Sequence, residues 1–106
     1  MFPPSVPSVQ VTDLDPAQPV PPDAVLVDVR EQDEWDAGHA PDAVHIPLGD
    51  LPDRVGELPD DRRLLVMCHA GGRSARATAW LVQGGFDAVN VDGGMVEWSR
   101  AGLPVV

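Results

Sequence analysis

The sequence predicts an α/β fold in which a small parallel sheet of about five strands is flanked by helices on both faces. Short apolar runs of strand length alternate with short helical patterns along the 106 residues. The connections between them are short, which favours parallel strands joined by covering helices. A chain of this length forms one small domain with a single core.

Five short apolar runs have the length of strands. The run at 64–67 reads Leu-Leu-Val-Met, and we expect it to be the central strand. The segment 15–22 holds too many prolines to be a good helix. In chain order, the expected strands are 9–11, 24–29, 43–46, 64–67 and 88–91.

Four segments predict short helices. In one of them Ala77, Trp80 and Leu81 recur at i, i+3 and i+4 before a stop at Gly84. This spacing places Trp80 toward the core, and we expect the same of Trp35. Glycine and proline end the other segments. In chain order, the expected helices are 31–35, 48–58, 73–83 and 95–101.

The ends and the composition of the chain indicate its setting. We expect residues 1–8 to form a flexible tail and residues 9–106 to form the domain. A single cysteine cannot make an internal disulfide. The N-terminus has neither the basic region nor the apolar stretch of a signal peptide, and no run approaches the ~20 apolar residues that span a bilayer. We therefore expect a cytoplasmic protein without a membrane partner.

The charge distribution excludes one class of partner and favours another. A formal net charge of −10 argues against binding to nucleic acid, which requires basic patches. Residues 64–83 nevertheless contain no acidic side chain, and they include Arg73 and Arg76. A small anionic substrate is therefore compatible with this part of the chain.

The only cysteine, Cys68, stands between the expected central strand and the following helix. It opens a six-residue loop that ends at Arg73, in which Gly71 and Gly72 give the backbone freedom to fold tightly. The N–H groups of such a loop and the amino end of the helix favour thiolate over thiol. A lone cysteine is often only a small core residue, but this setting favours a reactive one.

The loop suggests a nucleophilic reaction. The guanidinium of Arg73 offers a fork of donors that suits an oxyanion such as sulfonate or phosphate. A thiolate can attack sulfur or phosphorus there, and the loop N–H groups can hold the charged adduct. We expect Cys68 to be catalytic. The expected substrate-binding residues are His69, Ala70, Gly71, Gly72, Arg73 and Ser74.

Two further residues follow the second expected strand. Asp28 and Arg30 lie at the same carboxyl edge of the sheet as Cys68, where ligands bind in folds of this kind. Asp28 either accepts loop N–H groups or pairs with an arginine, and Arg30 binds a helix carboxylate such as that of Glu34. His39 and His45 lack metal-ligand spacing and are expected to cap or to hydrogen bond. We expect neither a metal nor a cofactor.

Three segments, in the right order, resemble the signatures of the rhodanese family. Together they extend the resemblance over residues 9–106. Asp42 replaces a glycine that is usual in the family, and the family's first helix is shortened by the prolines between 16 and 22. The segments are Leu26–Glu31 with Glu34-Trp35 and Gly38–Pro47, then Cys68–Ser74 as the active-site loop, and Asp92–Trp98 as the C-terminal signature.

This resemblance implies a persulfide on Cys68, formed from thiosulfate or a similar sulfane donor and passed to cyanide or a thiol. Four residues separate Cys68 from Arg73, whereas related phosphatases have five, so the smaller pocket favours sulfur over a phosphate ester. Three alternatives remain open: a sulfur-relay module for a protein acceptor, a non-catalytic regulatory module, and a phosphatase or arsenate reductase-like enzyme.

Overall fold

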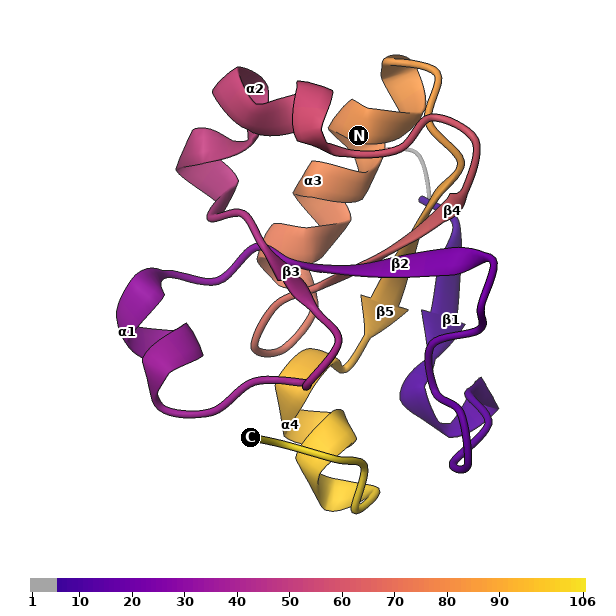
Figure 1. Cartoon of the computed structure of the whole chain (residues 1–106), viewed down its shortest axis with the longest axis vertical. Coiled ribbons are helices and arrows are strands. Elements are labelled where there is room, and N and C mark those ends of the chain that lie inside the picture. The colour runs from indigo at the N-terminus through magenta and orange to yellow at the C-terminus, as the bar shows by residue number, and fades with distance from the viewer. Residues whose placement is uncertain (1–5) are drawn as a thin grey trace, which may run out of the picture.

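One parallel five-stranded sheet forms the centre of the computed structural model, which describes residues 6–106 (Figure 1). The strand order is β1-β5-β4-β2-β3, so β4 is the middle strand, as expected. The α/β class is confirmed. The strands are β1 (Ser8–Gln10), β2 (Ala24–Asp28), β3 (Val44–His45), β4 (Arg63–Met67) and β5 (Ala88–Asp92).

The expected helix over 48–58 is instead three short pieces. The α-helical part is preceded and followed by a 3-10 turn. Pro52 has no N–H to donate to Leu48, so an α-helical ladder cannot run through the whole segment. The helices are α1 (Gln32–Asp36), α2 (Leu51–Arg54), α3 (Gly72–Gln83) and α4 (Gly94–Arg100), and the 3-10 turns are η1 (Val11–Asp13), η2 (Leu48–Asp50) and η3 (Val55–Glu57).

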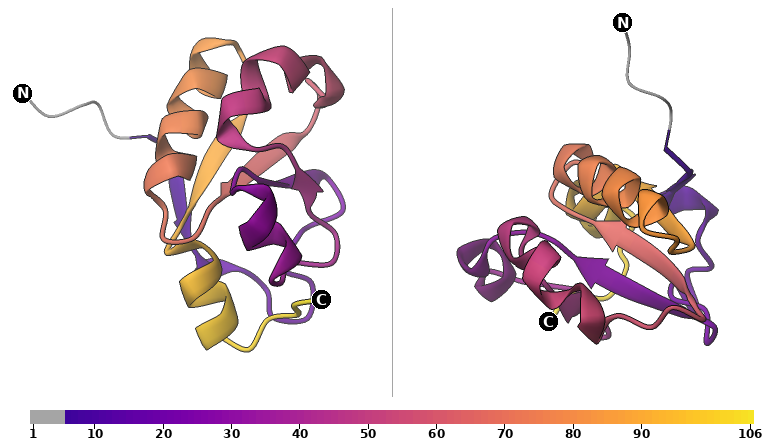
Figure 2. Two further views of the ribbon diagram at one scale, coloured as in Figure 1. Left: turned by 90° about the vertical axis from the view of Figure 1, so that its left-hand side faces the viewer. Right: turned by 90° about the horizontal axis from the view of Figure 1, so that it is seen from above.

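Helices cover both faces of the sheet, and the core therefore has two layers (Figure 2). Alternate residues of each strand point to opposite faces. In β4, for example, Leu65 and Met67 join the layer under α4, whereas Leu64 and Val66 join the layer under α2 and α3. Burial of these apolar side chains is the main source of the fold's stability.

Trp80 does not face the core, contrary to our expectation from the spacing. Its side chain is 43% exposed. The buried stripe of α3 instead runs through Ser74, Ala77, Thr78 and Leu81, which places Trp80 at the flank of the helix. Trp35 is only partly buried and also lies outside the two core clusters.

The structure reaches further toward the N-terminus than the sequence indicated. Residues 1–5, most of the expected tail, lie outside the described residues. β1 begins at Ser8, and the Pro7 carbonyl accepts the N–H of Asn90 at 2.7 Å. Between residues 6 and 106, no helix has both the length and the apolar character needed to cross a membrane.

The carboxyl ends of β2, β4 and β5 lie side by side, which positions the site. Asp28 and Met67 are register partners, and the Val29 N–H donates to the Met67 carbonyl at 2.9 Å. The segments that leave these strands therefore start next to one another. Cys68 is the first residue after β4, and Arg30 follows β2, so both lie at the predicted edge.

Candidate active site

Cys68 is buried, and its sulfur is surrounded by hydrogen-bond donors of its own loop. The Gly71 N–H donates to Sγ at 3.1 Å. The Ser74 Oγ lies 3.3 Å from the same sulfur and 3.2 Å from the Gly71 carbonyl oxygen, so its single proton has two acceptors within reach. Sequence reasoning placed Ser74 against the substrate, and the structure places it against the nucleophile.

These donors determine the ionisation of the thiol. Burial acts to raise the pKa of Cys68, because it penalises the charged form. The Ser74 hydroxyl and the N–H groups of Ser74, Gly71 and Ala70 act in the opposite direction and outweigh burial, so the pKa lies below that of an ordinary cysteine. The site therefore stabilises the thiolate, which is the reactive form, relative to an ordinary cysteine.

Gly71 gives the loop its shape. Its φ of +113° lies in the region that side chains other than glycine rarely adopt. A Cβ at this position would also lie 3.2 Å from the Asp92 Oδ1 and 3.3 Å from the Gly93 nitrogen. The Nδ2 of the buried Asn90, on β5, donates to the Gly71 carbonyl at 3.4 Å. A glycine is thus required where the loop passes the end of β5.

The amino end of α4 holds the other side of the loop. The Met95 N–H donates to the Cys68 carbonyl at 2.9 Å, and the Val96 N–H donates to the His69 carbonyl at 3.0 Å. A Cβ on Gly94, whose φ is +52°, would collide with both carbonyl oxygens. The glycine therefore allows the close contact between α4 and the loop.

Arg73 is bound by a carboxylate of the protein. Its Nη1 and Nη2 donate to the two carboxylate oxygens of Glu34 at 2.6 and 2.8 Å. This hydrogen bonding, opposed by burial, lowers the pKa of Glu34 to about 2, so the carboxylate is charged at any working pH. We expected Arg73 to face a substrate oxyanion, and in the structure each of its terminal nitrogens donates one hydrogen bond to Glu34 instead.

Asp28 and Arg30 form a buried ion pair that holds α1 beside the loop. The Arg30 Nη2 lies 2.8 Å from the Asp28 Oδ2. Asp28 thus pairs with an arginine, one of its two expected roles. The expected contact of Arg30 with the Glu34 carboxylate is wrong. Arg30 donates instead to the backbone carbonyls of Glu34 at 3.2 Å and Gly38 at 2.8 Å.

The remaining loop residues line the mouth of the site. His69, Ala70 and Gly72 are exposed, so none of them is fixed in the core. His69 lines a cleft of about 520 Å³ between α1 and α4. A larger hollow of about 680 Å³ lies at the amino ends of the strands and contains no nucleophile. The cleft is lined by Arg30, Glu34, Ala37, Gly38, His69, Met95, Val96, Ser99 and Val105.

The two other histidines have structural roles, as expected. Both imidazoles stack on the indole of Trp35, with ring centroids 3.6 Å away for His39 and 4.6 Å away for His45. The His39 Nδ1 bonds to the Trp35 carbonyl at 2.9 Å, and the His45 Nε2 bonds to the Arg30 carbonyl at 2.8 Å. The stack fixes the segment that follows α1.

Sequence reasoning missed three residues of the site. Glu34 was considered only as a partner of Arg30, Asn90 was read as an ordinary strand residue, and Gly94 was read as a turn. For Glu34 one indication was present in the sequence. It is one of three acidic residues in the segment 31–35, which is expected at the same edge as a loop that has a basic residue but no acidic one. No comparable sequence feature marks Asn90.

The fold and the loop together define an α/β domain whose buried cysteine lies in a cradle of hydrogen-bond donors, formed by the loop Cys68–Ser74. The family model of the rhodanese-like domain matches residues 14–101. The chain belongs to the rhodanese family.

Named relatives and a solved structure agree with this assignment. A sulfurtransferase of Allochromatium vinosum is 42% identical over 85 residues, which are 79% of each chain. A putative sulfurtransferase of Bacillus subtilis, YtwF, is 42% identical over 74% of this chain and 77% of its own. The crystal structure of a rhodanese-related protein from Thermoplasma volcanium has a TM-score of 0.84 and 33% identity, and the match covers 94% of this chain and 97% of that one.

Proposed function

We propose that this protein is a sulfurtransferase that moves a sulfane sulfur from thiosulfate or a similar donor to cyanide or a thiol through a persulfide on Cys68. The main support is the environment of the Cys68 sulfur, where the Gly71 N–H and the Ser74 hydroxyl both point at Sγ. Relatives named sulfurtransferases support the same reaction class.

In the first step the Cys68 thiolate attacks the outer sulfur of the donor. A bond forms between Sγ and this sulfur while the donor's own sulfur–sulfur bond breaks. With thiosulfate the leaving group is sulfite, which departs with the electron pair of the broken bond. The new persulfide keeps one negative charge on its outer sulfur, and the loop N–H groups stabilise that charge.

In the second step the acceptor attacks the outer sulfur of the persulfide. Cyanide takes the sulfur as thiocyanate, and the electron pair of the broken bond returns to the Cys68 thiolate. A thiol acceptor leaves as a persulfide and carries its own proton with it. Cys68 is the only cysteine of the chain, so no second thiol of the same chain can attack its inner sulfur to form a disulfide and expel the outer sulfur as hydrogen sulfide.

The size of the loop supports sulfur as the transferred atom. The four residues between Cys68 and Arg73 form a tight turn around Sγ, in which the Gly71 N–H already lies 3.1 Å from the sulfur. A single sulfur atom suits so small a space better than a tetrahedral phosphate ester. This argues against the phosphatase and arsenate reductase-like alternatives, and the complete cradle argues against a non-catalytic module.

Intact mass after incubation with thiosulfate tests the persulfide. We expect the wild-type chain to gain the mass of one sulfur atom and the variant Cys68→Ser to gain none. Added cyanide should then remove the sulfur from the wild type and release thiocyanate. A wild type that gains no sulfur from any of several donors would contradict the proposal, as would equal gain by Cys68→Ser.

A protein or low-molecular-weight thiol as the physiological acceptor belongs to the same proposal. A loaded chain that transfers sulfur slowly to cyanide and rapidly to one particular thiol, compared at equal concentrations, would identify a relay function. We also propose a cytoplasmic location, because a reducing compartment keeps a catalytic thiol free.

A further inference from the structure

The Glu34–Arg73 pair neutralises the positive charge that the loop would otherwise offer to a substrate. Each terminal nitrogen of Arg73 donates one hydrogen bond to Glu34, at 2.6 and 2.8 Å, so the carboxylate neutralises the guanidinium charge, and the two side chains are only about one-third exposed. A pair of this geometry holds the guanidinium in a fixed, two-point contact. The net charge of the pair is zero where a thiosulfate-binding site would offer a positive charge.

The other arginines near the loop do not replace Arg73. Arg30 is buried and bound to Asp28. Arg76 has no ion-pair partner among residues 6–106, but it lines a hollow on the side of α3 that faces Leu51 of α2. Within the part of the chain that the structure describes, the mouth of the cradle therefore offers N–H groups and no unpaired arginine.

This charge balance distinguishes between two kinds of sulfur donor. Thiosulfate brings two negative charges to a thiolate, so three charges meet in the transition state. An organic persulfide, R–S–SH or its anion R–S–S⁻, brings at most one, so no more than two charges meet. Without a cation, the repulsion of the first combination is not compensated. The site therefore suits the second kind of donor.

The cleft beside His69 offers space for the organic part of such a donor. Its volume of about 520 Å³ lies within the range of small-molecule sites. Much of its wall is apolar, from Ala37 on one side and from Met95, Val96 and Val105 on the other. It begins at the residue directly after the nucleophile.

We propose that the preferred sulfur donor is an organic persulfide, that Glu34 sets this preference by occupying Arg73, and that the cleft between α1 and α4 receives the organic group. This inference rests on the proposed sulfurtransferase function. Glu34 acts through Arg73 and is therefore a positioning residue.

The loading step balances without any further reagent. The Cys68 thiolate attacks the terminal sulfur of R–S–SH, and the Sγ–sulfur bond forms as the donor's sulfur–sulfur bond breaks. The leaving sulfur departs with the electron pair and takes up the proton of the transferred sulfur, so the thiol R–SH and the anionic Cys68 persulfide are formed. One negative charge is present before and after the step.

The variant Glu34→Gln tests the role of the ion pair. The measured quantity is a ratio of two second-order rate constants, that of Cys68 loading from thiosulfate divided by that of loading from benzyl persulfide. Because any change in the reactivity of Cys68 itself affects both rate constants, the ratio reports only the preference between donors. We expect this ratio to rise about tenfold in Glu34→Gln, because Arg73 becomes free to bind the sulfonate. An unchanged ratio would overturn the proposal.

The matched control is Glu57→Gln. Glu57 holds Arg54 through both carboxylate oxygens at 2.9 and 3.0 Å, as Glu34 holds Arg73, but on an exposed surface of η3. The same change of charge there should leave the ratio as in the wild type. A rise of equal size in both variants would show an effect of overall charge and contradict the role of Glu34.

A double variant, Glu34→Gln with Arg73→Gln, covers the case in which the single variant does not fold. It replaces a neutral ion pair by a neutral amide pair, so the ratio should stay within about twofold of the wild type. A selective loss of loading from thiosulfate would show that Arg73 serves this donor in the wild type, and the proposal would be wrong.

The cleft is tested with Ser99→Trp, which places a large side chain on an exposed position of its wall. Loading from benzyl persulfide should fall about tenfold relative to loading from inorganic hydrogen disulfide, which has no organic group, and Ser99→Ala should not change this relation. An equal effect on both donors would overturn the proposal. Failure of every donor to load the wild type would instead contradict the sulfurtransferase function itself.

Discussion

At the scale of single residues, the reactivity of Cys68 depends on a balance between burial and hydrogen bonding. Burial protects the thiol from solvent but disfavours its charge, and the Ser74 hydroxyl contributes the largest opposing effect. Ser74 is itself buried and lies one helical turn from the loop glycine that also donates to Sγ. The ionisation of Cys68 thus depends on a side chain that lies buried beneath the loop.

Replacing Ser74 by alanine should make Cys68 less reactive near neutral pH. Loss of the hydroxyl removes the largest influence that lowers the pKa, so the pKa rises and the thiolate fraction at a given pH below it falls. We expect alkylation by iodoacetamide at pH 7 to slow about tenfold, in line with a hydrogen bond to a charged group. The rate should be measured across pH, where its midpoint moves upward.

The control for this prediction is Ser8→Ala, the same change on the exposed strand β1, where the hydroxyl bonds only to the Val6 carbonyl. It should alkylate as the wild type does. Identical pH profiles for Ser74→Ala and the wild type would show that the hydroxyl does not stabilise the thiolate.

The residues that carry chemistry could be predicted where the information is local. Cys68 and its loop are marked by their position between a strand and a helix. The partner of Arg73 could not be predicted, because Glu34 lies 39 positions away and reaches it only through the placement of α1. That placement depends on the buried ion pair of Asp28 and Arg30. Removing one partner of such a pair typically lowers the free energy of unfolding by about 3–5 kcal/mol.

At the scale of elements, the site depends on how closely α4 approaches the loop. Two N–H groups of α4 bind carbonyls of Cys68 and His69, and Gly94 leaves room for this contact. The C-terminal signature therefore helps to build the site, although the hydrogen bonds to Sγ within residues 6–106 come from Gly71 and Ser74 and not from its side chains.

Gly94→Ala should destabilise the fold and distort the loop. Its effect combines a left-handed backbone, which costs about 1–2 kcal/mol for alanine, with the collision against the two loop carbonyls. Gly102→Ala is a matched control, since Gly102 also has a positive φ of +75° but nothing lies within 4 Å of its added Cβ. Urea unfolding should show the larger loss, by at least ~1 kcal/mol, for Gly94→Ala. Equal losses would show that the close contact contributes nothing.

The order of strands and helices followed from the sequence, because apolar runs and helical spacings are local properties. Two differences from the expected helices have local physical causes. Pro52 divides the segment 48–58, and α3 begins at Gly72, one residue before the expected start. The exposure of Trp80 follows from the buried stripe of α3, which includes the polar residues Ser74 and Thr78, so apolar spacing alone did not reveal it.

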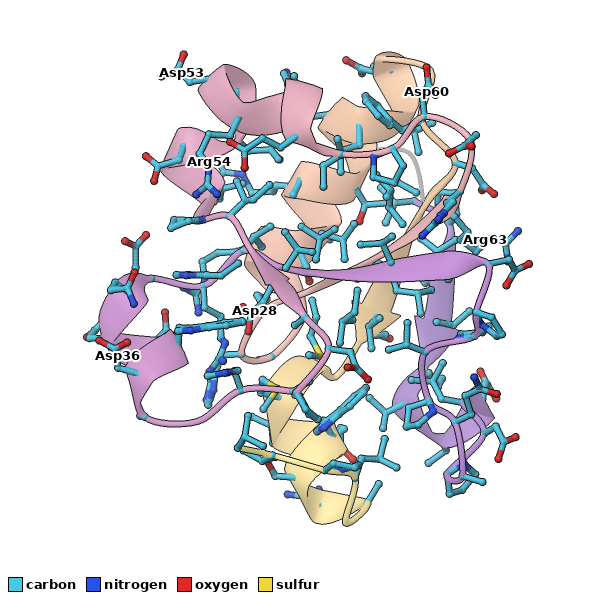
Figure 3. All side chains as sticks on the ribbon, in the orientation of Figure 1. Asp28, Asp36, Asp53, Arg54, Asp60 and Arg63 are labelled. Carbon is cyan, nitrogen blue, oxygen red and sulfur yellow. The ribbon has the colours of Figure 1, made fainter. Side chains whose placement is uncertain are left out.

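At the scale of the whole molecule, the protein is strongly acidic with a formal net charge of −10. Asp36, Asp53 and Asp60 lie at its outer edges and are exposed (Figure 3). The two ion pairs beside the loop, Asp28–Arg30 and Glu34–Arg73, each have a net charge of zero. A dianion that approaches the loop therefore meets a repulsive field that local cations do not offset.

Loading of Cys68 from thiosulfate should accelerate as salt is added. Screening shortens the reach of the repulsion from about 30 Å at 0.01 M to about 8 Å at 0.15 M ionic strength. We expect the rate constant to rise roughly two- to fivefold over this range, whereas loading from a neutral donor stays constant. Stopped-flow measurements with both donors would check this. A rate that falls with salt would indicate a net positive approach path.

The contact between α4 and the loop also orients the peptide groups of the loop. The carbonyl oxygens of Cys68 and His69 are turned outward to the N–H groups of α4, while the Gly71 N–H is turned inward to the sulfur. Peptide groups carry both a positive and a negative end, and a loop folded at random would present both to a bound anion. Here the lone pairs of two peptide groups are already engaged by a helix. The sulfur consequently faces the positive ends of the peptide dipoles, so the backbone adds to the effect of the Ser74 hydroxyl in favouring negative charge, and no charged side chain is needed at the sulfur.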